Sequence, residues 1–286
     1  MIKVLIITLY SGENEYNQCC QSVEEQQGFI IEHKIIKDLP KQEAHQKLYK
    51  NFNNNRSNFD YFAKLDADMA FSNPNALNNI LQNFNKDVDI VSATVHDGIT
   101  NSDMQSFNVF SSRCYFKFDT NDPLFTDSLE IEYEGQQVSY VDVERNVLHA
   151  FNPSPFQAFM FGVHRSLKVV QPGTKIPKIN SSYHQLRILN QAYLNYKRTG
   201  SVHAKNALLG ATLVFQGLIE TQALYQKKDY IDVFEKYVIQ EELDYIDPRL
   251  STRKFISLHK ILGKKRFFKG TFHILIKKLR IVNKHN

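Results

Sequence analysis

Residues 61–70 read Tyr-Phe-Ala-Lys-Leu-Asp-Ala-Asp-Met-Ala, an apolar run that ends in two aspartates separated by one small residue. If this run is an extended strand, alternate side chains point the same way, so Asp66 and Asp68 face one side. Two carboxylates held close together repel each other unless a positive charge lies between them. Mg²⁺ or Mn²⁺, bound by one or two carboxylates and by substrate phosphates, would supply that charge. A solvated turn at a strand end is the alternative.

Strands and helices are predicted to alternate on both sides of these aspartates. Apolar runs predict buried strands, and apolar residues spaced three and four apart predict amphipathic helices. The alternation predicts an α/β fold, an open and mostly parallel sheet covered by helices, which binds nucleotides beyond the carboxyl ends of its strands. Thr8, Tyr10 and Asp38 also fall at such ends. The predicted strands are 2–10, 29–37, 61–65 and 87–95, and the predicted helices are 13–27, 41–52 and the segment that Asn73 caps.

The later part of the chain is predicted to differ in organisation. Residues 105–150 have the pattern of strands and hairpins, and 151–165 that of a proline-bounded loop followed by an apolar strand. From 182 to about 245 the pattern is helical. We therefore expect three parts: residues 1–100, residues 101–245 with a helical region, and a basic tail at 246–286.

Composition excludes several classes of protein. The chain has 286 residues, of which 42% are hydrophobic and 23% charged, ordinary values for a globular protein and not those of a coiled coil, collagen or a disordered chain. Its three cysteines include no CxxC pair, which argues against a disulfide framework or a structural zinc site and favours a reducing compartment. We find neither a targeting segment nor an apolar run long enough to cross a bilayer, and expect a cytoplasmic location.

The first hundred residues resemble the nucleotide-binding half of GT-A glycosyltransferases, and most closely the inverting family 2 group. The resemblance rests on the first strand, the helix with Cys20-Gln21-Ser22-Val23-Glu24-Glu25-Gln26, the turn aspartate Asp38 and the D-x-D motif. It covers residues 1–95 well and 150–200 loosely, and it does not extend to 100–150 or the tail. It implies a GT-A-like fold, a nucleotide-sugar donor and a Mn²⁺ or Mg²⁺ cofactor. It also implies donor-binding roles for Thr8, Tyr10, Asp38, Lys64, Asp66 and Asp68.

The metal site implied by the resemblance consists of Asp66 and Asp68, with Asp68 as the metal ligand proper. Asp66 would reach either the ribose of the donor or the metal. Enzymes of this fold often add one more ligand from later in the chain, and His149 is our candidate for it. His203 is the alternative, and both histidines could equally have an ordinary structural role.

The acceptor side departs from the family pattern. Residues 159–165, Phe-Met-Phe-Gly-Val-His-Arg, match the family's apolar strand with Gly and Arg, but the acidic pair expected some twenty residues later is missing. His184 stands there instead, and a histidine with its ordinary pKa can take a hydroxyl proton at neutral pH. Packing or capping of the helix is its alternative role. Asp127 and Asp142 are rival bases, and a retaining mechanism also stays open.

The basic character of the chain is confined to its tail. Residues 251–286 contain eleven Lys or Arg and no Asp or Glu, whereas the first 250 residues hold 24 basic and 30 acidic side chains, a net charge of −6. On a helix the tail would be amphipathic, with Phe268, Phe272, Leu275, Leu279 and Val282 on one face and basic side chains on another. This pattern predicts peripheral contact with an anionic membrane, unless the helix docks on the body of the protein.

Together these features predict a metal-dependent, inverting glycosyltransferase on the cytoplasmic face of a membrane. It would move a sugar from a nucleoside-diphosphate donor, with UDP favoured by resemblance, to a saccharide or lipid-linked acceptor in surface polysaccharide synthesis. A sugar-nucleotide nucleotidyltransferase is the first alternative, although that class needs a Gly-rich, Arg-containing loop after strand one, and Ser11-Gly12-Glu13 lacks it. A nucleic-acid-binding protein is the second, but the tail phenylalanines lie away from the charges, so we expect no nucleic-acid partner.

Overall fold

The computed structural model describes residues 1–117, 124–126, 130–132, 137–141, 146–221, 226–239 and 246–282. The chain divides into two compact units, Met1–Ser154 and Pro155–Asn286. The predicted boundaries after residues 100 and 245 do not coincide with this division. The reason is that strands β6 (Ser102–Ser111), β9 (Gln137–Val141) and β10 (Val147–His149) pair with β5 (Val88–Asp97) of the first unit. Helices α8 (Leu258–Leu262) and α9 (Lys264–Val282) belong to the second unit.

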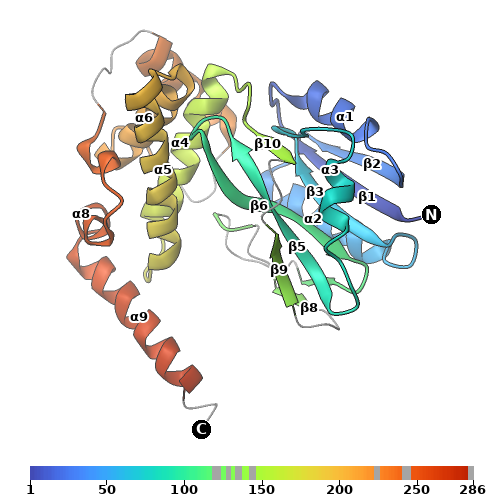
Figure 1. Ribbon diagram of the computed structural model, residues 1–286. Helices are drawn as coiled ribbons and strands as arrows, with labels where there is room; N and C mark the ends of the chain where they lie inside the picture. The colour runs from blue at the N-terminus through green and yellow to red at the C-terminus, as the bar shows by residue number, and fades with distance from the viewer. Residues whose placement is uncertain are drawn as a thin grey trace. The chain divides into compact units, whose positions relative to one another are not determined.

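The first unit is built on one mixed sheet with the strand order β2-β1-β3-β6-β5-β10-β4, and β9 also pairs with β5 (Figure 1). Pairing is parallel for β1 with β2 and β3, and for β5 with β9 and β10. It is antiparallel where β6 joins β3 and β5, and where β10 joins β4. The strands are β1 (Lys3–Tyr10), β2 (Ile30–Lys37), β3 (Tyr61–Asp66), β4 (Met69–Phe71), β5 (Val88–Asp97), β6 (Ser102–Ser111), β9 (Gln137–Val141) and β10 (Val147–His149); β7 (Tyr115–Lys117) and β8 (Glu130–Glu132) form a separate pair.

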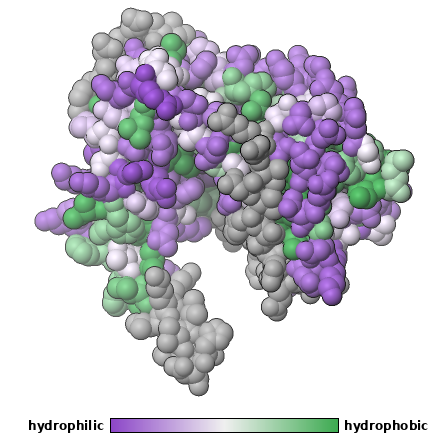
Figure 2. All heavy atoms as spheres, in the orientation of Figure 1, coloured by the Kyte–Doolittle hydropathy of each residue, from purple (hydrophilic) through white to green (hydrophobic). Residues whose placement is uncertain are grey.

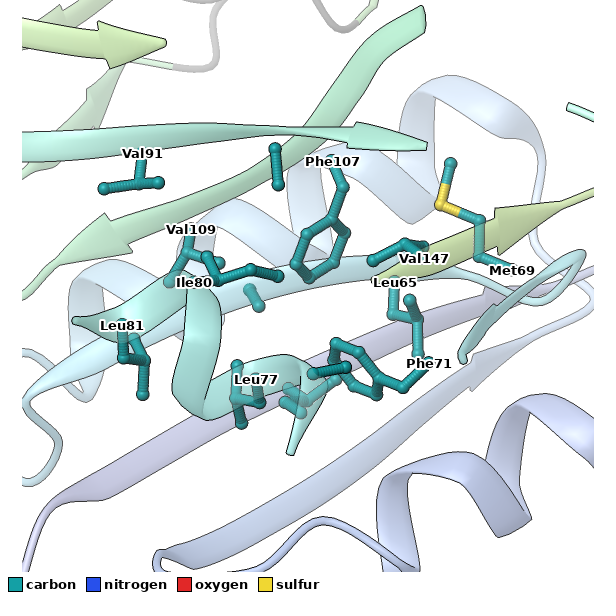
Figure 3. Close-up of a cluster of buried hydrophobic side chains, with 14 of the residues drawn as sticks. Leu65, Met69, Phe71, Leu77, Ile80, Leu81, Val91, Phe107, Val109 and Val147 are labelled. Carbon is teal, nitrogen blue, oxygen red and sulfur yellow. The ribbon is translucent and has the colours of Figure 1, made fainter. Parts of the chain in front are cut away.

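Helices cover both faces of this sheet, because β1 is apolar on both sides. Val4 and Ile6 point to one face, where they pack with α1 (Tyr16–Glu24) and α3 (Ala76–Leu81). Leu5 and Ile7 point to the other, where they pack with α2 (Lys41–Asn54). Figure 3 shows the first cluster, in which Leu77 and Ile80 of α3 lie among side chains of the sheet such as Phe107. The two-sided burial is typical of parallel strands, and the predicted α/β class is confirmed.

The short strand β10 determines how the functional side chains meet. It lies between β5, to which it is parallel, and β4, to which it is antiparallel. Its last residue, His149, is therefore the register partner of Asp97 at the end of β5 and of Met69 at the start of β4. Asp68 immediately precedes Met69, so three segments far apart in sequence converge at one edge of the sheet.

In its described residues the second unit is helical, as the sequence predicts from residue 182 onward, but the helical part begins earlier than predicted. Residues 151–165 were predicted to include an apolar strand, and this is wrong: Pro155–Val170 form helix α4. Residues 158–163, Ala-Phe-Met-Phe-Gly-Val, contain no polar side chain, and so short an apolar run cannot be told from a buried strand by its periodicity. The other helices are α5 (Ile179–Thr199), α6 (Val202–Gln216), α7 (Ile231–Phe234), α8 (Leu258–Leu262) and α9 (Lys264–Val282), with single turns at Lys227–Tyr230, Glu235–Ile239, Pro248–Ser251 and Phe255–Ser257.

Within the described part of the chain, no helix combines the length and the apolar composition needed to cross a bilayer.

Candidate active site

The D-x-D motif lies at the turn between β3 and β4. Asp66 ends β3, which runs parallel to β1, and its carboxylate is paired with Lys64 two residues earlier on the same strand face. The Lys64 Nζ atom lies 3.0 Å from one carboxylate oxygen and 3.1 Å from the other. Lys64 and Asp66, both selected from the sequence, are thus in contact, and Asp66 has a cationic partner from within the protein.

Asp68 is tied to the end of β10 by its backbone and its side chain. Its carbonyl oxygen accepts a hydrogen bond of 2.8 Å from the N–H of Ala150. Its carboxylate Oδ2 lies 3.5 Å from Nε2 of His149. The Asp68 side chain is 23% exposed as a whole, while its Oδ1 atom is buried. Two predicted site residues, 81 positions apart in the numbering, are therefore in contact.

The far side of the His149 ring faces a second carboxylate, Asp97. Nδ1 of His149 lies 3.0 Å from Oδ1 of Asp97, whose side chain is completely buried. The other Asp97 oxygen accepts hydrogen bonds from the backbone N–H and the hydroxyl of Thr100. The turn after β5 thus holds the Asp97 carboxylate in position, and this carboxylate orients the ring of His149. Sequence analysis did not select Asp97, although an aspartate before a glycine at the end of an apolar strand was a usable signal.

Charge explains why this buried row of side chains is stable. Burial alone would lower the pKa of His149, but the carboxylates of Asp68 and Asp97 outweigh burial and raise the pKa of His149 to about 10. Burial would likewise raise the pKa of Asp97, yet the hydrogen bonds from His149 and Thr100 bring it below its ordinary value. In the absence of a metal, the imidazolium form of His149 lies between two carboxylates.

Close backbone packing keeps the end of β10 in place. The N–H of Gly98 donates a 2.9 Å hydrogen bond to the carbonyl of His149. A Cβ atom at position 98 would clash with the carbonyl oxygen of Ala150 and would lie 3.0 Å from Cα of Phe151. Ala150 itself has a φ of 46°, an uncommon backbone conformation for a residue with a side chain. Only glycine at position 98 allows β5 to approach this loop so closely.

The donor set fits a divalent cation held by two protein ligands. Ligand atoms about 2.1 Å from one ion lie roughly 3.0–3.4 Å apart at angles of 90° to 109°, close to the 3.5 Å between Asp68 Oδ2 and His149 Nε2. A metal-binding histidine usually has its other ring nitrogen bonded to a carboxylate, as His149 does through Asp97. Within the described residues, no three His, Cys, Asp or Glu side chains are grouped so as to hold a metal by themselves.

The residues predicted to line the nucleoside occupy different environments. Thr8 is completely buried, and its hydroxyl oxygen lies 2.9 Å from Nε2 of His33 on β2. Tyr10 is partly exposed and stacks on Tyr16 of α1, with 4.2 Å between ring centroids. Lys37 lies over the Tyr16 ring, with its Nζ 4.9 Å from the ring centroid. Tyr16 and Lys37 were not selected from the sequence: Lys37 is the register partner of Tyr10 on β2, and Tyr16 is the first residue of α1.

Asp38 follows directly on β2 and is exposed at the same end of the sheet. Its backbone N–H donates a 3.1 Å hydrogen bond to the carbonyl of Tyr10, and its φ is 54°. Tyr10 and Asp38 thus lie together at the carboxyl ends of β1 and β2, as predicted, whereas Thr8 lies beneath them in the core.

The remaining candidates lie in the second unit or outside the described residues. His184 is on α5, and burial lowers its pKa, as do the charges of Arg165, Arg187 and Lys168. His203 is the second residue of α6. Asp127 and Asp142 lie outside the described residues.

Comparison with known proteins gives little beyond a general likeness of fold. No family model matches the chain, and no curated protein matches it. Solved structures that resemble it include S. aureus TarS residues 1–349 in complex with UDP-GlcNAc, 9% identical, with a TM-score of 0.35 over 93% of this chain and 92% of that one. The same TarS fragment without UDP-GlcNAc has 12% identity and a TM-score of 0.33, over 86% of this chain and 94% of that one. A197 from STIV has 10% identity and a TM-score of 0.32, over 51% of this chain and all of that one. These scores carry no argument about function, which has to come from the site itself.

Proposed function

We propose that this protein is a metal-dependent glycosyltransferase that uses a nucleoside-diphosphate sugar as donor. The observation that carries the proposal is the contact between Asp68 of the D-x-D turn and His149, with Asp97 bonded to the far side of the ring. This arrangement lies where the parallel strands β1, β3 and β5 end, the edge at which α/β sheets bind nucleotides. The choice of UDP as the nucleotide rests on the sequence resemblance alone.

Each residue of the site has a distinct task in this proposal. Asp68 and His149 hold Mn²⁺ or Mg²⁺, and Asp97 keeps the His149 ring oriented. When bound, the cation neutralises the negative charge that develops on the diphosphate as the glycosidic bond breaks. Asp66, paired with Lys64, reaches the ribose or the metal. Tyr10 and Asp38 contact the nucleoside, while Thr8 is buried and bonded to His33 and so does not line the nucleoside itself.

We assign the base of an inverting reaction to His184. Its lowered pKa keeps the imidazole neutral at pH 7, so it is able to accept the proton of an acceptor hydroxyl. Asp127 and Asp142 are the rival bases, and a retaining reaction would need no base in this role. A saccharide or lipid-linked acceptor in surface polysaccharide synthesis, on the cytoplasmic face of a membrane, completes the proposal.

The loop after β1 argues against the nucleotidyltransferase alternative. The backbone N–H and the hydroxyl of Ser11 both bond the carboxylate of Glu13, at 2.7 Å each. A phosphate-binding loop needs its N–H groups free to point at the phosphates. Here the Glu13 carboxylate accepts the hydrogen bond that the Ser11 N–H would otherwise donate to a phosphate. The negative charge of Glu13 would also repel a triphosphate.

A hydrolysis screen of UDP-, GDP-, CMP- and dTDP-sugars, with and without Mn²⁺, tests the proposal. One donor should be cleaved in the presence of the metal. Asp68→Asn should reduce that turnover on the order of 10³-fold, since metal stabilisation of the leaving diphosphate contributes several kcal/mol. Asp103→Asn, an exposed aspartate on β6, is the matched control and should keep its activity. Full turnover in EDTA, or by the Asp68→Asn protein, would refute metal dependence.

A further inference from the structure

Helix α9 is docked on the second unit through a face that is not its apolar one. Gly270 is buried, and a Cβ atom there would lie 2.5 Å from Cγ1 of Ile179 and 2.7 Å from the carbonyl oxygen of Pro177. One turn earlier, Arg266 donates hydrogen bonds of 2.7 Å to the carbonyls of Val170 and Gln171. The face of the helix that carries Gly270 and Arg266 is therefore the one that packs against the rest of the second unit.

This rotation leaves a large apolar face uncovered. Phe268, Phe272 and Leu275 are 62%, 64% and 53% exposed. At about 100° per residue they lie within roughly 60° of one another and about 160° from Gly270. Ile256, shortly before α8, is 74% exposed, and Figure 2 shows hydrophobic atoms next to hydrophilic ones over α8 and the first part of α9. We call Phe268, Phe272 and Leu275 the outer face of α9.

The outer face is bordered by positive charge. Lys264, Lys265 and Lys269 are exposed beside it on the same helix. Residues 251–286 carry eleven Lys or Arg and no acidic residue, in contrast to the net charge of −6 of the preceding 250 residues. An apolar stripe with lysines at its border is the pattern of a helix that lies in a membrane interface.

We propose that the outer face of α9 binds the surface of an anionic lipid bilayer, with the rings inserted among the lipids and the lysines at the headgroups. Charge complementarity selects this occupant. A second copy of the chain would bring two such basic segments together, and their mutual repulsion would oppose pairing. The inference rests on α9 alone and holds or fails independently of the proposed transferase activity.

Vesicle binding by the full chain tests whether the face binds lipid. The protein should sediment with phosphatidylcholine vesicles that contain about one-third phosphatidylglycerol, and only weakly with pure phosphatidylcholine, since each lysine near an anionic surface adds about fivefold in affinity. High salt should weaken binding only in part, because it screens the charges and not the apolar insertion. Equal binding to both kinds of vesicle, or to neither, would overturn the proposal.

Substitutions then test which face is involved. The Phe268→Asn and Phe272→Asn double variant should lose about tenfold in affinity for each ring. Because both rings are exposed, the fold should be retained, and far-UV circular dichroism checks this. A Leu194→Asn and Val202→Asn double variant is the matched control, as both of these apolar side chains are exposed elsewhere on the second unit, at 48% and 63%. If the two double variants bind vesicles equally well, the outer face is not the lipid-binding surface.

A single tryptophan gives a direct signal of insertion. The chain contains no tryptophan, so Phe272→Trp introduces the sole indole fluorophore. Its emission should shift to the blue on addition of the anionic vesicles and be quenched by brominated lipid, whereas a Leu194→Trp protein should change little. A blue-shifted emission without lipid, together with a dimer in sedimentation equilibrium that the double Phe variant abolishes, would show that a second copy covers the face and would refute membrane binding.

Discussion

Replacing Asp97 with asparagine should destabilise the protein although the side chain keeps its size. Asp97 is completely buried and lies 3.0 Å from Nδ1 of His149, whereas Asp68, the other partner of the ring, is 3.5 Å away and partly exposed. Removing the Asp97 charge leaves the buried imidazolium with only the more distant carboxylate. Breaking a buried ion pair from one side costs about 3–5 kcal/mol. The asparagine amide has one acceptor oxygen, so it can accept from His149 or from the backbone N–H of Thr100 but not from both. We therefore expect a cost of about 3–5 kcal/mol.

The chain contains a matched control for this change. His96 and Asp103 form a second histidine–aspartate pair, at 2.7 Å, on the same hairpin, but the Asp103 side chain is 48% exposed. Asp103→Asn should therefore cost about 0.5 kcal/mol or less. Urea unfolding of both variants in EDTA, which removes any bound metal, measures the difference. Equal costs for the two variants would refute the reasoning.

The pH dependence of the same experiment has a defined sign. The pKa of His149 is raised to about 10 in the folded protein, above the ordinary value of about 6.5. The stability that this provides is fully present below pH 6.5 and is lost as the pH rises through 10. The difference between parent and Asp97→Asn should thus be largest near pH 6 and shrink toward pH 10. A difference that grows with pH would contradict the proposed charge state of His149.

Two further substitutions test the backbone around the site and the assignment of the base. Gly98→Ala should cost about 1–3 kcal/mol in urea unfolding, because the new methyl group displaces the carbonyl of Ala150, and a cost under about 0.5 kcal/mol would contradict it. His184→Ala should lower turnover by about 10²–10⁴ with donor affinity unchanged. The parent's activity should fall only at a pH below the ordinary histidine pKa, because burial and nearby cations lower the pKa of His184. A variant as active as the parent would move the role of the base to Asp127 or Asp142.

The first half of the fold could be predicted because local pattern and tertiary environment agree there. The apolar run 2–10 becomes β1, and the spacing of apolar residues in 41–52 becomes α2. The strand predicted in 151–165 was wrong because residues 158–163 carry no polar side chain, and a run this short does not show the helical period of α4. The sequence does carry a helix-start signal there, Ser154 followed by Pro155, and α4 begins at this proline.

The role of Gly270 shows where an amphipathic pattern misleads. From the sequence, this glycine only weakens the first turns of a tail helix, and the apolar face is free to dock on the body. In the structure the glycine is the docking point, because its missing side chain lets the helix approach Ile179. Phe268, Phe272 and Leu275 are therefore left exposed. A helical projection identifies the faces of a helix, but it does not tell which face the protein uses for its own packing.

Only those parts of the site that lie within one continuous segment of sequence could be predicted. Asp66 and Asp68 are separated by one residue in a recognisable motif, and we expect them to need a metal because their carboxylates repel each other. The structure changes that reason: Asp66 is paired with Lys64, and Asp68 with His149. Charge repulsion alone therefore does not require a cation here. The stronger argument is the ring of His149, whose second nitrogen is bonded to a buried carboxylate as in metal-binding histidines. That argument depends on strand β10 lying between β5 and β4, a pairing of distant segments that no local sequence pattern encodes.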